Sequence, residues 1–388
     1  MPPCGGGATL LVVTTAVVVL GLLAAGNAPG AQAAGTGSAQ SLDEVTQQYR
    51  SVDREDAVAT VALWTQREVE AGTQGLLEAV EAVKAAALAG HATPEDVAKS
   101  EATLPAAAVL LSDAARRALH HGDPRRARWE LQVAARLAHA TPSTGGFAGF
   151  TRRFYLVAGL MLHGMADLAG AYEMLSEGRR QTEDDAELLL ALGAVCETVA
   201  ALRTYERPEE PRRQPDARDE SQFMIEGELG ETGRLPRTGL ADAQALLAKA
   251  LRRDPGLLEA RLRLGRVLLL RGRPREALPE LERVGRESPR PAQCYMARLF
   301  EGRTRERLGE PRGAATAFAA AVERVPRGQS ALVALGRALD RLGEGTRAQE
   351  AFDTALQAEV QRDPWWDYIK GQPDRIDALL EELRRLVP

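Results

Sequence analysis

The sequence contains few aromatic residues and few residues that favour strands. Aromatic residues make up 4% of the 388 residues, while Ala, Leu and Arg dominate the composition. Ala, Leu and Arg all favour helices, and a large sheet would need more β-branched and aromatic residues. The composition therefore predicts an all-α protein. At this length the chain could form two or three compact domains or one long repeat array.

Lysine is also scarce, because only four of the 49 basic residues are lysines. A GC-rich coding sequence would produce this excess of arginine as readily as selection for bidentate ligand binding. The net charge of −5 leaves the chain without a general positive field. We therefore expect no nucleic-acid partner.

The N-terminal residues contain no Lys or Arg and no long polar stretch. Ala8–Ala25 is apolar or small apart from its threonines, and Ala31–Ala33 has the small-x-small pattern of a cleavage site. We expect residues 1–34 to be a signal peptide cleaved near Ala33, which would export the chain to the periplasm or the medium. Alternatively, the apolar run stays as a membrane anchor and is the only part in contact with a membrane; a cytosolic chain is the third possibility. Residues 35–40 would be a linker.

Cysteine is rare, and only Cys196 and Cys294 would remain after signal cleavage. They lie far apart in the sequence, and their spacing does not suggest a metal site. We expect two buried thiols, although an exported protein could also join them in a disulfide.

Small residues recur with a fixed spacing over most of the chain. Gly265 is followed seven residues later by Gly272, twelve later by Ala277, sixteen later by Leu281 and 24 later by Pro289. The pattern of small, turn, small and bulky residues recurs in other registers. We predict that these small residues pack the repeats together: Ala115, Ala127, Gly159, Ala171, Gly193, Ala243, Gly265, Ala277, Gly302, Ala314, Gly336 and Ala348.

This spacing is typical of stacked helical hairpins. Two antiparallel helices approach closely where small side chains face each other, as Gly265 and Ala277 would. Gly272 would end the first helix in a left-handed conformation, and Pro289 would stop the second. We expect the bulky residue, such as Leu281, to fill the gap against the neighbouring repeat.

These positions resemble the tetratricopeptide repeat family, whose period of 34 matches the steps from Gly302 to Gly336 and from Gly159 to Gly193. The bulky residue before the glycine is present as Leu192, Leu264 and Leu335. The sequence departs from the family where an aromatic residue is replaced by Leu268, Arg305 or Leu339. The resemblance implies a right-handed α-solenoid of antiparallel hairpins. The expected repeats are 108–141, 152–185, 186–255, 258–291, 295–328 and 329–362, within an array of 108–362.

One repeat is interrupted and both ends of the array are irregular. The repeat 186–255 contains an insertion at 207–239, which we expect to be disordered, either a tolerated loop or a binding segment. Residues 41–107 predict an N-terminal helical region with a degenerate hairpin at Ser41–Trp64, a helix at Thr73–Ala89 and a cap at Thr93.

Residues 363–388 follow the array. Trp365 and Trp366 would either seal the last repeat or form an exposed anchor. Asp374–Leu386 is amphipathic, and we expect it to form a polar capping helix at the end of the array.

Motifs for catalysis and for cofactors are missing from the sequence. We find no phosphate-binding loop, no pair of histidines with metal spacing and no Gly-x-Ser-x-Gly context. We therefore expect no catalytic residue, no cofactor and no metal site.

Arginines follow the small anchors in the later repeats. In the tetratricopeptide family the residue after the anchor lies on the concave face of the superhelix, which implies such a position for Arg266, Arg303 and Arg337. With Arg263, Arg307 and Arg341 they would form a ladder that binds an acidic segment. Alternatively, the arginines pair with their own helices, for example through Glu306 and Asp340.

The expected function is a non-catalytic scaffold that binds another protein or peptide outside the cytoplasm on this concave face. A module that binds a ligand or a cell-wall polymer is the first alternative, and an enzyme on a helical scaffold is the second.

Overall fold

The computed structural model describes residues 40–51, 53–142, 147, 149–182, 184–205 and 238–387. The predicted signal segment 1–34 and most of the predicted insertion lie outside these ranges. The chain divides into two units, Met1–Gln40 and Ser41–Pro388, and the helices of the described residues belong to the second unit.

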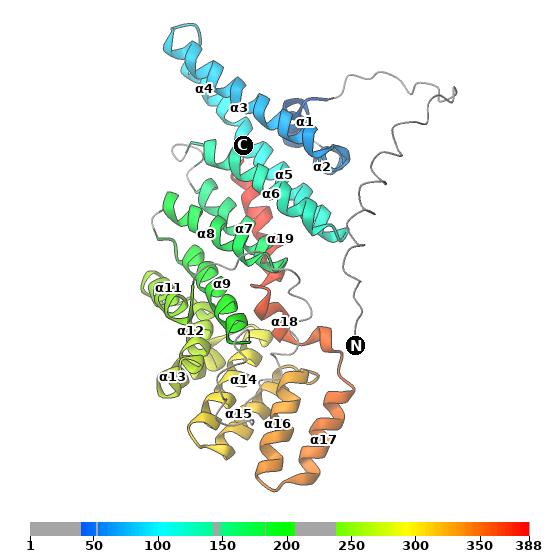
Figure 1. Ribbon diagram of the computed structural model, residues 1–388, viewed down its shortest axis with the longest axis vertical. Coiled ribbons are helices and arrows are strands. Elements are labelled where there is room, and N and C mark those ends of the chain that lie inside the picture. The colour runs from blue at the N-terminus through cyan, green and yellow to red at the C-terminus, as the bar shows by residue number, and fades with distance from the viewer. Residues whose placement is uncertain are drawn as a thin grey trace, which may run out of the picture. The chain divides into compact units, whose positions relative to one another are not determined.

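The described residues contain helices and no strands, so the protein is an all-α solenoid (Figure 1). The elements are α1 (Leu42–Ser51), α2 (Arg54–Leu63), α3 (Gln66–Leu88), α4 (Pro94–Glu101), α5 (Thr103–His120), α6 (Pro124–Ala140), α7 (Phe150–Gly164), α8 (Leu168–Gln181), α9 (Ala186–Tyr205), α11 (Leu240–Arg253), α12 (Leu258–Leu270), α13 (Pro274–Glu287), α14 (Pro291–Arg307), α15 (Pro311–Arg324), α16 (Gln329–Arg341), α17 (Gly345–Leu356), η3 (Val360–Arg362), α18 (Pro364–Ile369), η4 (Pro373–Arg375) and α19 (Ile376–Arg385).

From α5 onward, the helices pair into hairpins. The pairs are α5–α6, α7–α8, α9–α11, α12–α13, α14–α15 and α16–α17, and the second helix of one pair also packs on the first helix of the next. We call the first helix of each pair the A helix and the second the B helix. The surface formed by successive A helices is called the A-helix face.

From α7 onward, each hairpin closes where a bulky side chain of the B helix lies on a glycine of the A helix. A Cβ atom added to Gly265 would lie 2.6 Å from the side chain of Leu281, and one added to Gly336 would lie 2.6 Å from Phe352. Any larger residue would push the two helices apart. Leu281 therefore packs on Gly265 within its own hairpin, and it is fully buried. In the interrupted repeat Leu247 of α11 takes this place against Gly193 of α9.

The N-terminal helices are longer than the sequence analysis predicted. Helix α3 begins at Gln66, not at Thr73, because Thr65 and Glu68 form a capping box that bonds the first turn. The predicted cap at Thr93 is present and pairs reciprocally with Asp96.

The buried side chains form two clusters that meet at α9. One face of α9 contributes Leu188 and Val195 to the cluster of the earlier helices. Another face contributes Leu189 and Cys196 to the cluster of the later helices. Cys196 and Cys294 are both buried and free, so the expectation of two buried thiols is confirmed.

The turn between the A and B helices needs a residue with positive φ. Glycine fills this position at Gly272 (φ 71°), Gly309 (φ 77°) and Gly343 (φ 79°), as expected for a left-handed helix end. The turn after α7 has Ala166 at φ 62° instead. A β-carbon in this conformation contacts the backbone unfavourably, so Ala166 is strained.

We expect Ala166→Gly to stabilise the protein by about 1 kcal/mol, because glycine adopts the left-handed region without this clash. Urea unfolding followed by circular dichroism would measure the change. The reverse substitution at the corresponding turn, Gly309→Ala, should destabilise the protein by a similar amount. An unchanged or lower urea midpoint for Ala166→Gly would contradict the assignment of strain to this turn.

Candidate functional site

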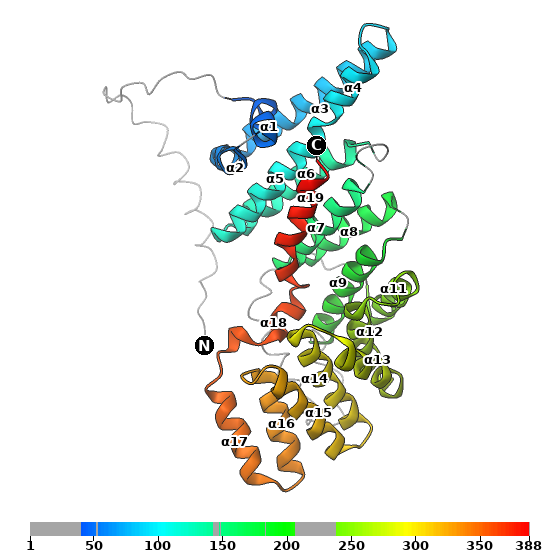
Figure 2. The same cartoon turned by 180° about the vertical axis from the view of Figure 1, so that it is seen from behind.

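The C-terminal segment, residues 363–386, returns along the A-helix face of the array. Helix α18 packs on α14, and α19 packs on α7 and α5 (Figures 1 and 2). The expected capping helix therefore lies against the first hairpins and does not cover the last one. Its buried residues explain this position, because Ile376, Leu380 and Leu383 fit into the cluster of the earlier helices.

The segment fills its site closely. Where residues 371, 372 and 375 of the segment face the helices α7, α9 and α12, the cavity that remains has a volume of only about 10 Å³. This volume is about the minimum for one water molecule. The A-helix face over α7 to α12 is therefore occupied in this structure.

A buried polar cluster lies beneath α18. Glu197 of α9 accepts hydrogen bonds from Arg263 Nη1 (3.0 Å), from Arg266 Nη1 (2.7 Å) and from the hydroxyl of Tyr368 (2.5 Å). Arg263 Nη2 also donates to the backbone carbonyl of Tyr368 at 2.7 Å, and its Nε donates to Glu259 at 2.8 Å. Glu197 is fully buried, and Arg263 is 1% exposed. A charge in such surroundings is stable only with partners of this quality.

The surroundings of this cluster keep Tyr368 and Arg263 protonated, so that both groups can donate hydrogen bonds. Burial, and then the nearby charge of Glu197, raise the pKa of Tyr368 well above its usual value, so the phenol stays protonated and donates. Burial alone would lower the pKa of Arg263, but the carboxylates of Glu259 and Glu197 and the neighbouring Tyr368 raise it above its usual value.

Aromatic rings surround the two guanidinium groups. The guanidinium of Arg263 lies 4.2 Å from the ring centre of Tyr368, and that of Arg266 lies 4.9 Å from Trp365. Phe300 of α14 meets both rings edge-on. Guanidinium groups over aromatic faces are favourable, more so when they are away from water. Trp365 is 1% exposed, so it does not form an exposed anchor. It packs on Phe300 of α14 and not on the last repeat.

The rest of the segment binds through ion pairs. Arg116 of α5 holds Asp377 in a bidentate pair, with Nε–Oδ1 at 2.8 Å and Nη2–Oδ2 at 2.9 Å. Arg384 Nη2 donates to Asp113 at 2.7 Å, and Asp113 also accepts from the hydroxyl of Tyr49 at 2.6 Å. This last contact joins α1, α5 and α19.

The six predicted binding arginines divide into two groups. Arg263 and Arg266 are buried beneath α18 and are not available as an open acid-binding surface. The other four lie towards the C-terminal ends of α14 and α16. Here Arg307 and Arg341 are exposed, while Arg303 and Arg337 are half-buried.

The acid that balances this second group is Glu306. It lies 3.5 Å from Arg303 and 2.9 Å from Arg341. The alternative of an arginine that pairs with its own helix is thus seen for Arg303, while Arg341 of α16 pairs with Glu306 of the neighbouring α14. We call Arg303, Arg307, Arg337 and Arg341 the open arginine face.

The sequence analysis missed Glu197 and Tyr368 as site residues. A signal for Glu197 was available, since it is a lone charged residue within the apolar run Leu188–Ala201 of α9. Such a residue inside a buried helix needs a partner. No sequence pattern pointed to Tyr368 as that partner.

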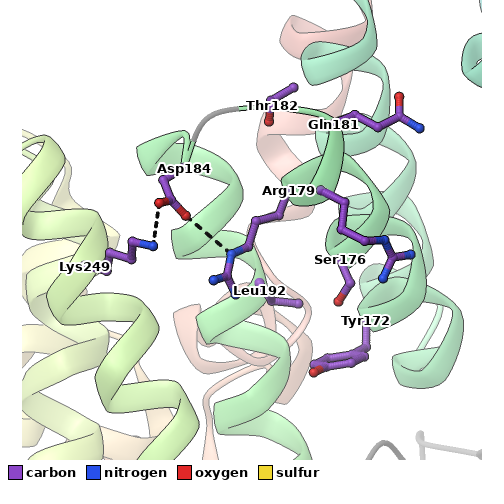
Figure 3. Close-up of a pocket in the computed structure, with 9 residues that line it drawn as sticks. Tyr172, Ser176, Arg179, Gln181, Thr182, Asp184, Leu192 and Lys249 are labelled. Atoms are coloured by element: carbon purple, nitrogen blue, oxygen red, sulfur yellow. Dashed lines mark ion pairs between the residues drawn. The ribbon is translucent and has the colours of Figure 1, made fainter.

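An open cleft of about 670 Å³ lies between α8, α9 and α11 (Figure 3). Its only carboxylate among the lining residues is Asp184, which lies 2.5 Å from Lys249 and 3.5 Å from Arg179. The hydrogen bond from Lys249 holds the pKa of Asp184 below its usual range. Tyr172 is the one aromatic ring in the lining, so the cleft lacks the stacked platforms typical of glycan sites. The complete lining is Tyr172, Ser176, Arg179, Arg180, Gln181, Thr182, Asp184, Leu192 and Lys249.

The described residues contain neither a metal-binding cluster nor a membrane-spanning helix. Within them, no group of three or more His, Cys, Asp or Glu residues has the arrangement of a metal site. No helix in these ranges combines the length and apolar character that crossing a membrane requires.

The hairpins and the C-terminal segment that packs on their A helices define a helical repeat protein. Two sequence models of the tetratricopeptide repeat match the chain, at residues 240–299 and 301–364. The chain therefore contains tetratricopeptide repeats, and such repeats support a role in protein interactions.

Solved structures with similar repeats include two of MamA and one of YrrB. The MamA double mutant of strain RS-1 is 22% identical, with 50% of this chain and 85% of that chain covered and a TM-score of 0.35. MamA 41-end from Desulfovibrio magneticus RS-1 is 20% identical, with 66% and 97% covered and a TM-score of 0.35. YrrB, described as a tetratricopeptide protein with an unusual peptide-binding site, is 18% identical, with 60% and 91% covered and a TM-score of 0.34. No curated protein sequence matches the chain.

We expect Glu197→Gln to destabilise the protein by about 3 kcal/mol, because it leaves Arg263 and Arg266 buried without their shared carboxylate. Glu187→Gln is the matched control. Glu187 also binds two arginines, Arg153 and Arg375, but its side chain is 27% exposed, so its loss should cost less than about 1 kcal/mol. Urea unfolding would compare the two, and equal losses would argue against a special role for Glu197.

The buried ring of His163 should make the free energy of unfolding depend on pH. Its ring is buried beside Gly371, and burial together with the charge of Arg263 lowers its pKa from 6.5 to about 3. Below pH 6.5, His163 therefore binds a proton in the unfolded chain but stays neutral in the folded chain. The stabilisation is fully present above pH 6.5 and is lost as the pH falls towards 3, by up to about 1.4 kcal/mol per pH unit.

Between pH 7.5 and pH 4.5, wild type should lose roughly 2–3 kcal/mol more stability than His163→Gln. His139→Gln is the control, since the side chain of His139 is 66% exposed and this variant should keep the wild-type pH dependence. Urea unfolding at the two pH values tests this. If His163→Gln retained the full slope, the loss would have to come from other groups.

Proposed function

We propose that the chain is a non-catalytic scaffold outside the cytoplasm, which holds an acidic segment of another protein on the open arginine face. The partner would lie along α14 and α16, beyond the C-terminal segment. The chemistry required is that of a carboxylate bound by a guanidinium group, whose planar fork accepts both oxygens.

The observation that supports this proposal is the pair formed by Arg116 and Asp377. Arg116 directly follows the small anchor Ala115, and Arg303 and Arg337 directly follow the anchors Gly302 and Gly336. At the first of these equivalent positions, the arginine binds a carboxylate of a docked polypeptide segment in bidentate geometry. The same residue in the later hairpins presents the same group to a segment from another protein.

Glu306 is shared between Arg303 and Arg341, so one carboxylate faces two guanidinium groups. A partner carboxylate can therefore bind without leaving a buried charge unpaired, since Arg307 and Arg341 are exposed. We expect the interaction to weaken with salt, because exposed charges are screened.

The location outside the cytoplasm is proposed from the sequence. The apolar run Ala8–Ala25 and the small-x-small site at Ala31–Ala33 support export, with cleavage near Ala33 or retention as an anchor.

The test is affinity capture from membrane and periplasmic fractions with wild type and with the triple variant Arg303→Glu, Arg307→Glu, Arg341→Glu. We expect the variant to lose at least 90% of the partner captured by wild type, because three attractive charges become repulsive. An equal charge change on α15 and the loop after it, Arg312→Glu, Arg324→Glu, Arg327→Glu, is the control and should capture normally. If wild type, the triple variant and the control captured equal amounts of the partner, the proposal would be wrong.

A further inference from the structure

The C-terminal segment is attached to the array as a bound peptide would be. Its two helices, α18 and α19, have 6 and 10 residues, which is too short for stable helices in water. Their order therefore comes from docking on the A helices. The partners of the segment lie far away in the sequence, for example Glu197 for Tyr368 and Arg116 for Asp377.

The two halves of the segment are anchored differently. Helix α19 places Ile376, Leu379, Leu380 and Leu383 in the cluster of the earlier helices and adds the ion pair of Arg384 with Asp113. Helix α18 joins the cluster of the later helices through Trp365, Tyr368 and Ile369. The junction between the halves contains two residues with positive φ, Gly371 (75°) and Gln372 (63°). This junction is where one half can separate from the other.

The fit of α18 has two defects. The indole nitrogen of Trp365 is buried, and among the described atoms it has no hydrogen-bond partner. An unsatisfied buried donor lowers the affinity of the segment for its site. Gln372 has a left-handed backbone that a residue with a side chain adopts only under strain. Both defects belong to the segment and not to the surface on which it docks.

The docking surface, in contrast, is well ordered by its own contacts. Arg263 is fixed by Glu259, and Glu259 in turn accepts a hydrogen bond of 2.9 Å from Gln293. Arg266 and Arg263 hold the carboxylate of Glu197 from α12, independently of the segment. An apolar surface would close a solenoid with less desolvation cost than these four buried charges. Such a pre-organised polar cluster beside an aromatic wall is typical of a recognition site.

We propose that Glu197, Arg263, Arg266 and Phe300 form a binding site for a short helix of a partner protein, and that α18 occupies this site in its absence. We call these four residues the α18 site. The partner helix carries two aromatic side chains three residues apart, as Trp365 and Tyr368 are. One ring lies over the guanidinium of Arg266, and a hydroxyl on the other donates to Glu197.

This site extends the proposed function, since it is a second contact of the same scaffold. Its chemistry differs from that of the open arginine face. Arg263 and Arg266 are already paired with Glu197 and Glu259, so the α18 site takes a hydroxyl donor and aromatic rings instead of a further carboxylate. When the partner binds, α18 leaves and α19 remains docked.

The experiment uses the full chain and a fluorescent peptide that copies residues 359–373. We expect the double variant Trp365→Ala, Tyr368→Ala to bind the peptide at least 10-fold more tightly than wild type, because its own α18 no longer competes. Adding Arg266→Ala to this variant should remove the gain. Arg362→Ala, whose side chain is 78% exposed, is the control in the segment and should bind the peptide as wild type does. A folded double variant that fails to bind the peptide would overturn the proposal.

A second measurement covers the case in which the double variant does not fold. In hydrogen–deuterium exchange of wild type, we expect the amides of α18 to exchange at least 10-fold faster than those of α19. Equal protection of the two helices would mean that α18 does not open separately, and would overturn the proposal.

The two proposals can fail separately. Charge reversal at Arg303, Arg307 and Arg341 should leave binding of the peptide to the double variant unchanged. Loss of the captured partner with intact peptide binding contradicts only the open arginine face. Loss of peptide binding with intact capture contradicts only the α18 site.

Discussion

The carboxylate of Glu197 is the contact on which the arrangement of the array depends. It lies on α9, where the two hydrophobic clusters of the chain meet, and it binds α12 through Arg263 and Arg266 and the C-terminal segment through Tyr368. A buried ion cluster adds little net stability compared with apolar packing, but it penalises any arrangement in which its partners are missing. It therefore fixes which surfaces of α9, α12 and α18 face each other.

The hairpins themselves could be predicted from the sequence because their packing is local. A glycine on the A helix and a bulky residue sixteen positions later form one contact, as Gly265 does with Leu281, and the turn between them shows in a further glycine. These constraints act within a few tens of residues and therefore leave a period in the sequence. The same period helped to place α11 as the partner of α9 across the insertion.

The position of the C-terminal segment could not be predicted, because its contacts have no period. Tyr368 meets Glu197 and Arg384 meets Asp113 only after the chain has folded back over the array. An amphipathic helix at the end of a repeat array indicates that one face will be buried, but not against which hairpin. The arginine ladder was wrong as one continuous surface for the same reason. Arg263 and Arg266 occupy the expected A-helix positions, but the returning segment covers them. The candidate site could thus be predicted as a set of positions, while its division into a covered and an open part could not.

The contact among Tyr49, Asp113 and Arg384 has a consequence for biosynthesis. Repeat arrays usually fold by adding each hairpin to its predecessor, since contacts join only neighbours. Here the A-helix surface of the first hairpins is completed by residues near the end of the chain. During translation, the apolar surface of α5 and α7 that receives Ile376 and Leu380 stays open until α19 has been synthesised. The packing of the first hairpins therefore has to wait for α19. We expect the array to fold more slowly and more cooperatively than one with local contacts alone.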